Sequence, residues 1–227
     1  MIKAVIFDFD GLIIDTESPS YHAFRSVYQE YGVELPLSTY AKCVGTTFDH
    51  FNPYTYLSEQ VGRHIEADLI KSKFNPIYAE MVSTITLRPG VEKYLEAAKE
   101  RNLKIGLASS SPISWIRPYL TKYDLAGYFD SVCTADNVSK VKPDPELYLL
   151  ALQNLGIAGN EAISFEDSLN GFTAAKAAGL HCVVVPNEIT AHFDFQGCDL
   201  LIPSMDEMDL NEVIERISNK LRKDGNE

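Results

Sequence analysis

The sequence lacks the features that mark several classes of protein. Its four cysteines form no CxxC pair and no cluster with histidine, which argues against a zinc site and indicates buried, reduced thiols. No apolar run approaches the ~20 residues that a membrane-spanning helix needs. Met1 leads directly into an apolar segment, without a charged-then-apolar leader. These absences predict a cytoplasmic protein that does not enter a membrane.

Positive charge is also scarce, since the formal net charge is −12. The basic segment KLRK at 220–223 is the one such cluster in the chain, and we assign it to the end of a solvated helix. Nucleic-acid recognition needs a basic face, so we expect no nucleic-acid partner. An acidic protein that binds an anion needs a local cation, which a metal ion or a placed lysine can supply. The oligomeric state stays open, and a monomer is compatible with the sequence.

The sequence does contain a regular alternation of strand-like and helix-like segments. Short apolar segments followed by polar residues are typical of parallel strands that are covered on both faces. Strand and helix in repeated alternation predict an α/β fold with a doubly wound, Rossmann-like parallel sheet. The predicted strands are 2–9, 104–110, 162–167, 181–186 and 199–203, with 129–135 as a weaker candidate, and the predicted helices are 90–102, 145–156 and 168–179.

Residues 17–84 interrupt this alternation. They contain helix-like stretches at 21–32 and 79–85 and no convincing buried strand. A simple strand–helix–strand unit takes about 30 residues, and structureless loops of such length are uncommon in compact domains. We therefore predict a core domain formed by 1–16 and 85–227, with a helical cap domain inserted at 17–84.

Four strand or loop ends carry side chains suited to phosphate chemistry. Taken singly, each of them is more often a helix cap, a loop residue or a surface charge. However, the carboxyl ends of parallel strands meet at one edge of the sheet, where ligands bind. Acids that converge there repel one another unless a hard cation such as Mg²⁺ lies between them, and a lysine and a hydroxyl can hold the phosphate. The residues are Asp8 and Asp10, Ser109 to Ser111, Lys140 and Lys142, and Glu166 and Asp167.

The motif VIFDFDGLIIDTE at 5–17, followed by SS at 109–110, KP at 142–143 and EDS at 166–168, resembles the haloacid dehalogenase-like hydrolases. The insertion after the first motif resembles the helical-cap branch, which contains β-phosphoglucomutase and phosphoglycolate-type phosphatases. The resemblance covers essentially the whole chain. It implies a Mg²⁺-dependent phosphatase that removes phosphate from a small phosphorylated metabolite through an aspartyl-phosphate.

The resemblance also implies a role for each site residue. Asp8 is the nucleophile, and Asp10 is the general acid for the leaving group and then the base for water. The phosphoryl group is bound by Ser109, Ser110 and Lys142, the lysine that precedes a proline. Mg²⁺ is held by Asp8, the carbonyl of Asp10 and Asp167, with Glu166 adjacent. The cap presents Gly45, Thr46 and Thr47 to the substrate.

Within the family, the cap separates a phosphatase from a sugar-phosphate mutase. β-Phosphoglucomutase has a sequence similar to the stretch VGTTFDH at 44–50. At the position of Phe48, however, the mutase has an arginine that binds the distal phosphate of the sugar. Its histidine after the first motif aligns with Ser20, two residues before His22, and its polar loop residues align with Pro112 and Ile113. These departures favour the phosphatase, with the mutase as the alternative. We expect Trp115 to pack on the core rather than in the site, and Phe51, Tyr54 and Tyr56 to pack in the cap.

Two alternatives belong to other functional classes. A response-regulator receiver also groups acids, a hydroxyl residue and a lysine at strand ends, but the chain is longer than the about 120 residues of a single receiver domain and places its DxD motif on the first strand. A phosphate-binding protein without turnover would keep the fold, although the intact set of acids, hydroxyl and lysine argues against it.

Overall fold

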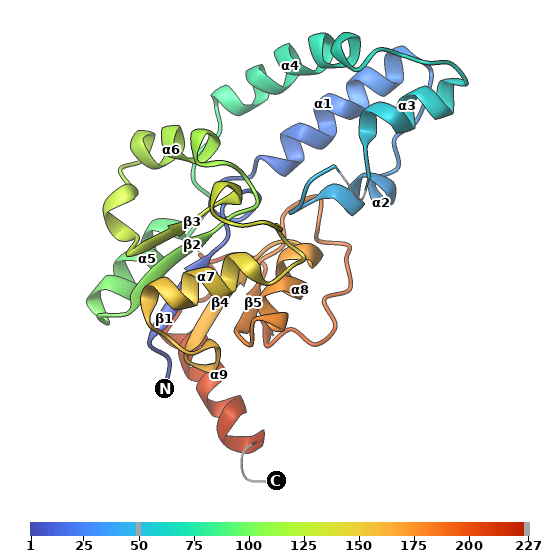
Figure 1. Ribbon diagram of the computed structural model, residues 1–227. Helices are drawn as coiled ribbons and strands as arrows, with labels where there is room; N and C mark the ends of the chain where they lie inside the picture. Colours follow the sequence, from blue (N-terminus) through green and yellow to red (C-terminus); the bar gives the residue numbers. More distant parts are fainter. Residues whose placement is uncertain (49–50, 225–227) are drawn as a thin grey trace.

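The computed structural model describes residues 1–48 and 51–224, and a six-stranded sheet forms its centre (Figure 1). All five strand pairings are parallel, in the order β3-β2-β1-β4-β5-β6. The predicted α/β class with a parallel sheet is confirmed. The strands are β1 (Ala4–Phe7), β2 (Lys104–Ala108), β3 (Ser131–Cys133), β4 (Ala162–Glu166), β5 (His181–Val184) and β6 (Leu200–Leu201).

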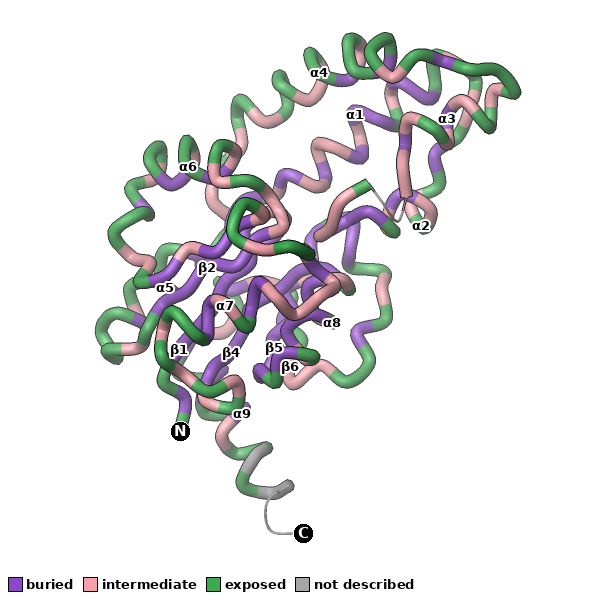
Figure 2. Tube along the Cα trace, viewed as in Figure 1, coloured by how far each residue is buried: buried purple, intermediate pink, exposed green. Residues whose placement is uncertain are grey.

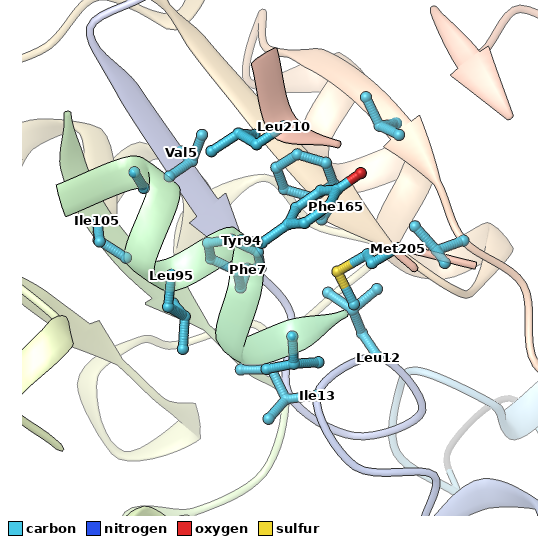
Figure 3. Packing of buried hydrophobic residues seen from close by; sticks show 14 of the residues in the cluster. Val5, Phe7, Leu12, Ile13, Tyr94, Leu95, Ile105, Phe165, Met205 and Leu210 are labelled. Atoms are coloured by element: carbon cyan, nitrogen blue, oxygen red, sulfur yellow. The ribbon is translucent and has the colours of Figure 1, made fainter. Parts of the chain in front are cut away.

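Helices cover both faces of this sheet because alternate residues of each strand point to opposite sides. Val5 and Phe7 of β1 belong to an apolar cluster with α5 (Val91–Glu100) and α9 (Leu210–Asp224), part of which Figure 3 shows. Ala4 and Ile6 belong to a second cluster with α7 (Glu146–Leu155) and α8 (Leu169–Ala177). The central strands β1, β4 and β5 are accordingly buried along their whole length, whereas the short edge strand β6 is not (Figure 2).

Each strand lies within its predicted range, including the weaker candidate at 129–135, and is shorter than that range. Helix α6 (Ile113–Lys122) was not predicted. The predicted helix at 79–85 is the end of the longer α4 (Ala67–Ser83), which continues through Pro76 because Ile70 and Phe74 are buried on its inner face. None of the helices within 1–48 and 51–224 is both long and apolar enough to cross a bilayer.

The segment between β1 and α5 forms a separate helical layer at the upper edge of Figure 1. Its helices pack around a third apolar cluster that contains Phe24, Tyr40 and Phe74. The chain leaves and re-enters the core side by side, since Ile14 pairs with Leu87 in an antiparallel bridge. The domain boundaries at 17–84 stay a prediction. The helices of this layer are α1 (Glu17–Glu30), α2 (Leu37–Tyr40), α3 (Pro53–Val61) and α4.

Candidate active site

Asp8 and Lys142 form a buried ion pair at the carboxyl end of the sheet. Asp8 is the first residue after β1, and Lys142 Nζ donates to its Oδ1 at 2.5 Å and to Oε1 of Glu166 at 2.7 Å. Lys142 is 1% exposed. Burial raises the pKa of Asp8 to about 8, although Lys142 acts in the opposite direction. Burial also acts to lower the pKa of Lys142, but Asp8 and Glu166 outweigh it, so the lysine is a fixed cation.

Asp8, Glu166 and Asp167 have the geometry and the chemistry of a magnesium site. One oxygen from each of the three lies within 4.8 Å of the others. Oε2 of Glu166 and Oδ1 of Asp167 are buried and have no hydrogen-bond partner among the described residues. Burial, followed by the charge of Asp8, raises the pKa of Asp167 well above its usual range. Since Mg²⁺ prefers carboxylate oxygens and would relieve this repulsion, the three residues fit it.

Two residues that the sequence analysis missed orient these acids. Asn187, which follows β5, donates its Nδ2 hydrogen to Oδ2 of Asp167 at 2.8 Å. Tyr148 on α7 donates its hydroxyl to Oε1 of Glu166. Gly11 is required beside them, because a Cβ atom there would lie 2.1 Å from Oδ2 of Asp167. The signal for Asn187 was its place after a buried strand; nothing in the local sequence indicated Tyr148.

Asp10 is held by donors from three parts of the chain. Thr16 Oγ1 and Trp115 Nε1 each donate to its Oδ1 at 2.8 Å. Ser111 Oγ donates to its Oδ2 at 2.7 Å. The prediction that Trp115 packs on the core rather than in the site is therefore wrong. Trp115 does pack against the core, but α6 starts at the same sheet edge and carries its indole N–H to Asp10.

The serine loop after β2 contacts both the core and the cap. Ser109 is 1% exposed, and its Oγ accepts from the backbone N–H of Ser111 at 3.0 Å. Ser110 Oγ donates to the carbonyl of Gly45 at 3.1 Å. Lys140, the lysine that was not preferred, is exposed and pairs with Asp144 at 3.9 Å. Phosphate binding by Ser109 and Ser110 stays a prediction.

The cap loop at Gly45 and Thr46 lies directly over the site. Gly45 has φ +74°, and its N–H donates to Oε1 of Glu17 at 3.4 Å. Thr46 Oγ1 donates to the carbonyl of Lys142 at 2.5 Å. Thr47 lines a different hollow, beside the Lys142 loop. Substrate contact by these three residues stays a prediction, and the end of the stretch 44–50 lies outside the described residues.

A cavity of about 490 Å³ separates the cap from the sheet edge. Asp8, Asp10 and Ser109 line one part of it, and aromatic rings line much of the rest. Phe51, Tyr54 and Tyr56 pack in the cap as predicted, and Tyr54 also lines the cavity. The other described lining residues are Thr16, Glu17, Ser20, Phe24, Tyr40, Cys43, Gly45, Thr46, Phe48, Phe74, Tyr78, Ser110, Ser111, Pro112 and Trp115.

The departures from the mutase pattern fall in or beside this cavity. Phe48 lines it, and so does Ser20, whose Oγ accepts from Tyr40 at 2.7 Å. His22 instead points to Glu188, with its Nε2 3.0 Å from Oε1. A histidine or an arginine for a second phosphate is thus missing from the described lining residues.

Comparison with known proteins gives matches along most of the chain. Residues 5–185 match the family described as haloacid dehalogenase-like hydrolase. The protein YhcW of Bacillus subtilis (strain 168) is 44% identical over 97% of this chain and 100% of its own length. The "Phosphorylated carbohydrates phosphatase" of Thermotoga maritima is 32% identical over 79% of this chain and 82% of its own.

A solved structure gives the same result. The crystal structure of a CbbY variant from Rhodobacter sphaeroides, in complex with xylulose-(1,5)bisphosphate, has a TM-score of 0.70 and 27% identity. The match covers 92% of this chain and 97% of that chain. The match of 5–185 and the identities above 30% establish what the motifs predicted: this chain belongs to the haloacid dehalogenase-like hydrolases, and it is an enzyme, a phosphatase of that family.

Proposed function

We propose that this protein is a Mg²⁺-dependent phosphatase that acts on a small phosphorylated metabolite through an aspartyl-phosphate on Asp8. One observation carries the proposal: the buried Lys142 bridges Asp8 and Glu166, next to two buried carboxylate oxygens that have no hydrogen-bond partner within residues 1–48 and 51–224. Phosphoryl transfer needs positioning and charge neutralisation above all, and this arrangement supplies both. The name of the Thermotoga maritima relative supports a phosphorylated carbohydrate as the substrate.

In the first step, a carboxylate oxygen of Asp8 attacks phosphorus while the bond from phosphorus to the leaving oxygen breaks. Asp10 gives its proton to that oxygen, so the product alcohol leaves uncharged. Lys142 is held on Asp8 and can neutralise negative charge on the phosphoryl oxygens. Ser109 contributes its hydroxyl and the backbone that follows β2.

In the second step, Asp10 takes a proton from a water molecule that attacks the same phosphorus atom. The bond from phosphorus to Asp8 breaks, which returns the carboxylate and releases inorganic phosphate. Using one carboxylate as nucleophile splits a difficult hydrolysis into two easier displacements. The cap loop at Gly45 and Thr46, which is hydrogen-bonded to the core over the site, limits the access of water during the first step.

Mg²⁺ would be held by Asp8, Asp167 and the backbone carbonyl of Asp10, with Glu166 adjacent, and when bound it supplies positive charge for the phosphoryl oxygens. The partnerless oxygens of Glu166 and Asp167 support this assignment. The mutase alternative would need a cation for a second phosphate, which the described lining of the cavity does not offer. A receiver or silent binding module is disfavoured by membership of a hydrolase family.

The test is release of inorganic phosphate from p-nitrophenyl phosphate and from a panel of sugar phosphates, with Mg²⁺ and with a chelator. We expect activity only with Mg²⁺, and loss of at least about a thousandfold in Asp8→Asn. Asp68→Asn, which changes an acid that is 94% exposed on α4, is the matched control and should keep full activity. Wild-type turnover in Asp8→Asn would refute the assignment of Asp8 as the nucleophile. Isomerisation of glucose 1-phosphate without release of phosphate would favour the mutase.

A further inference from the structure

The cavity between cap and core has two chemically different ends. Asp8, Asp10 and Ser109 lie at one end, where the phosphoryl group is handled under the proposed function. From Trp115, which donates to Asp10, a row of aromatic rings leads away into the cap. The leaving oxygen receives its proton from Asp10, so the leaving group starts at the Trp115 end of this row.

The row of rings is continuous. The centroids of Trp115 and Tyr78 are 6.2 Å apart with the rings 24° from parallel, and Tyr78 stacks on Phe74 at 5.2 Å and 17°. The ring centroid of Phe74 lies 4.3 Å from that of Phe24, and the centroid of Phe24 lies 6.2 Å from that of Phe48, which ends the row. All five rings line the cavity.

Packing of the cap alone does not account for this row. Phe24 and Phe74 are buried in the apolar cluster of the cap, but Phe48 is 39% exposed and still lines the cavity. Tyr78 and Trp115 are half-buried and face each other from a cap helix and a core helix. Aromatic rings that border a cavity bind the apolar face of another ring by apolar and edge-to-face contact.

The charged side chains that line the cavity are all acidic in the described part of the chain, and the nearby cation Lys142 is taken up by Asp8 and Glu166. The charged residues among its described lining residues are Asp8, Asp10 and Glu17. Burial, followed by the charge of Asp10, raises the pKa of Glu17 to about 8, as expected for a carboxyl group that faces no cation. Lys71 lies 5.8 Å from the Tyr54 ring but is turned to Asp68, at 3.3 Å.

We infer that the substrate of this site is a phosphate monoester whose leaving group is uncharged and carries a ring with an apolar face. The aromatic row binds that ring, while the lack of a cation among the described lining residues, together with Glu17 once it is ionised, disfavours a second phosphate or a carboxylate. Phosphorylated acids and bisphosphates are therefore poor substrates. The inference rests on the proposed function and narrows its substrate class.

Two pairs of esters test the inference on the wild-type enzyme with Mg²⁺. Benzyl phosphate and ethyl phosphate differ in the ring but release alcohols of similar acidity, and we expect kcat/KM to be at least about tenfold higher for the benzyl ester. 2-Hydroxyethyl phosphate and phosphoglycolate have similar size but differ in the charge of the leaving group. At pH 9, where Glu17 is ionised, we expect at least about a tenfold preference for the ester whose leaving group is uncharged. Equal values in both pairs would overturn the inference.

Xylulose 1,5-bisphosphate belongs in the same panel, because a solved relative is described with it. Turnover of this bisphosphate above that of benzyl phosphate would also overturn the inference. The proposed function fails in a different way, by absence of phosphate release from p-nitrophenyl phosphate with Mg²⁺. The two failures are therefore distinguishable.

Two substitutions test the residues that the inference names. Glu17→Gln keeps the shape of the side chain, and at pH 9, above the pKa of about 8 at which Glu17 becomes charged, it should raise kcat/KM for phosphoglycolate relative to 2-hydroxyethyl phosphate by at least about fivefold. Phe48→Arg should raise the ratio of bisphosphate to benzyl phosphate turnover by at least about tenfold, whereas Phe48→Leu, the matched control, should not. Because each result is a ratio within one variant, partial loss of folding does not obscure it. Unchanged ratios in both variants would refute the charge argument.

Discussion

Trp115 donates its indole N–H to Oδ1 of Asp10 at 2.8 Å, so the one tryptophan of the sequence lies against the proposed acid–base residue. The same ring stacks near Tyr78 of the cap helix α4. A core helix thus connects the orientation of Asp10 with the position of the cap. Because Thr16 donates to the same oxygen, the carboxylate of Asp10 is fixed from two sides.

Replacing Trp115 by phenylalanine removes the hydrogen bond but keeps an aromatic ring opposite Tyr78. Hydrogen bonds to a charged group contribute about 1.5–3 kcal/mol, so we expect Trp115→Phe to lower kcat for p-nitrophenyl phosphate by about ten- to a hundredfold with little change in melting temperature. Tyr119→Phe is the control, because the Tyr119 ring centroid lies 5.3 Å from that of Trp115, whereas Asp10 takes its hydrogen bonds from Trp115, Thr16 and the serine loop. Equal kcat in the two variants would argue against a positioning role for the indole N–H.

Lys142 should matter for stability as well as for catalysis. Its removal leaves Asp8 and Glu166 buried without their cation, so Lys142→Met should lower the free energy of unfolding of the metal-free protein by about 3–5 kcal/mol in urea. Lys140→Met, two residues earlier at a side chain that is 75% exposed, should change it by less than about 0.5 kcal/mol. A loss of similar size in both variants would contradict the ion-pair argument.

Binding of Mg²⁺ should be visible without turnover. A ligand at a hundred times its dissociation constant stabilises the folded state by about 2.7 kcal/mol, so saturating Mg²⁺ should raise the melting temperature of the wild type. Asp167→Asn removes a carboxylate from the acid cluster and should abolish most of this rise. Asp68→Asn should retain it, and a full Mg²⁺ response in Asp167→Asn would place the ion elsewhere.

Glu17 should make the stability of the metal-free protein depend on pH. Its pKa is raised from 4.5 to about 8 in the folded protein, so the folded state holds a proton that the unfolded state releases between these values. The contribution of Glu17 to stability is therefore complete below about pH 4.5 and is lost as the pH rises through about 8. In urea titrations, the free energy of unfolding of Glu17→Gln should decrease less over this pH range than that of the wild type. Glu34 is exposed, so Glu34→Gln should show the same decrease as the wild type.

Gly45 and Gly32 form a matched pair for the cap loop, with φ of +74° and +71°. A Cβ atom at Gly45 would lie 2.1 Å from Ser168 Oγ, whereas one at Gly32 would meet no atom within 4 Å. Alanine in the left-handed region costs roughly 1–2 kcal/mol in either place. We expect only Gly45→Ala to lower kcat/KM as well, by at least about tenfold, because it displaces the loop over Lys142. Equal values of kcat/KM in the two variants would show that the position of this loop does not affect catalysis.

The site residues expected from the sequence and the residues that orient them differ in how the chain encodes them. Asp8, Ser109 and Asp167 each follow a strand, and Lys142 precedes a helix, so the periodicity of apolar residues places them at one sheet edge. This local signal is strong because parallel strands are buried on both faces. The apolar periodicity of helices was a weaker guide in the cap, where it predicted only the end of α4, because Pro76 interrupts the pattern of that helix.

The sequence by itself determined the α/β fold, and it placed the candidate site, with its acids, hydroxyl and lysine, at one edge of the sheet, because strand periodicity and strand ends are local properties. Only the tertiary structure decided that Trp115 reaches Asp10, that Asn187 and Tyr148 orient the acids, and that five rings from α1, α4, α6 and the cap loop align along one cavity. Those contacts join residues far apart in the chain, and their geometry depends on how whole helices pack rather than on any pattern of neighbouring residues.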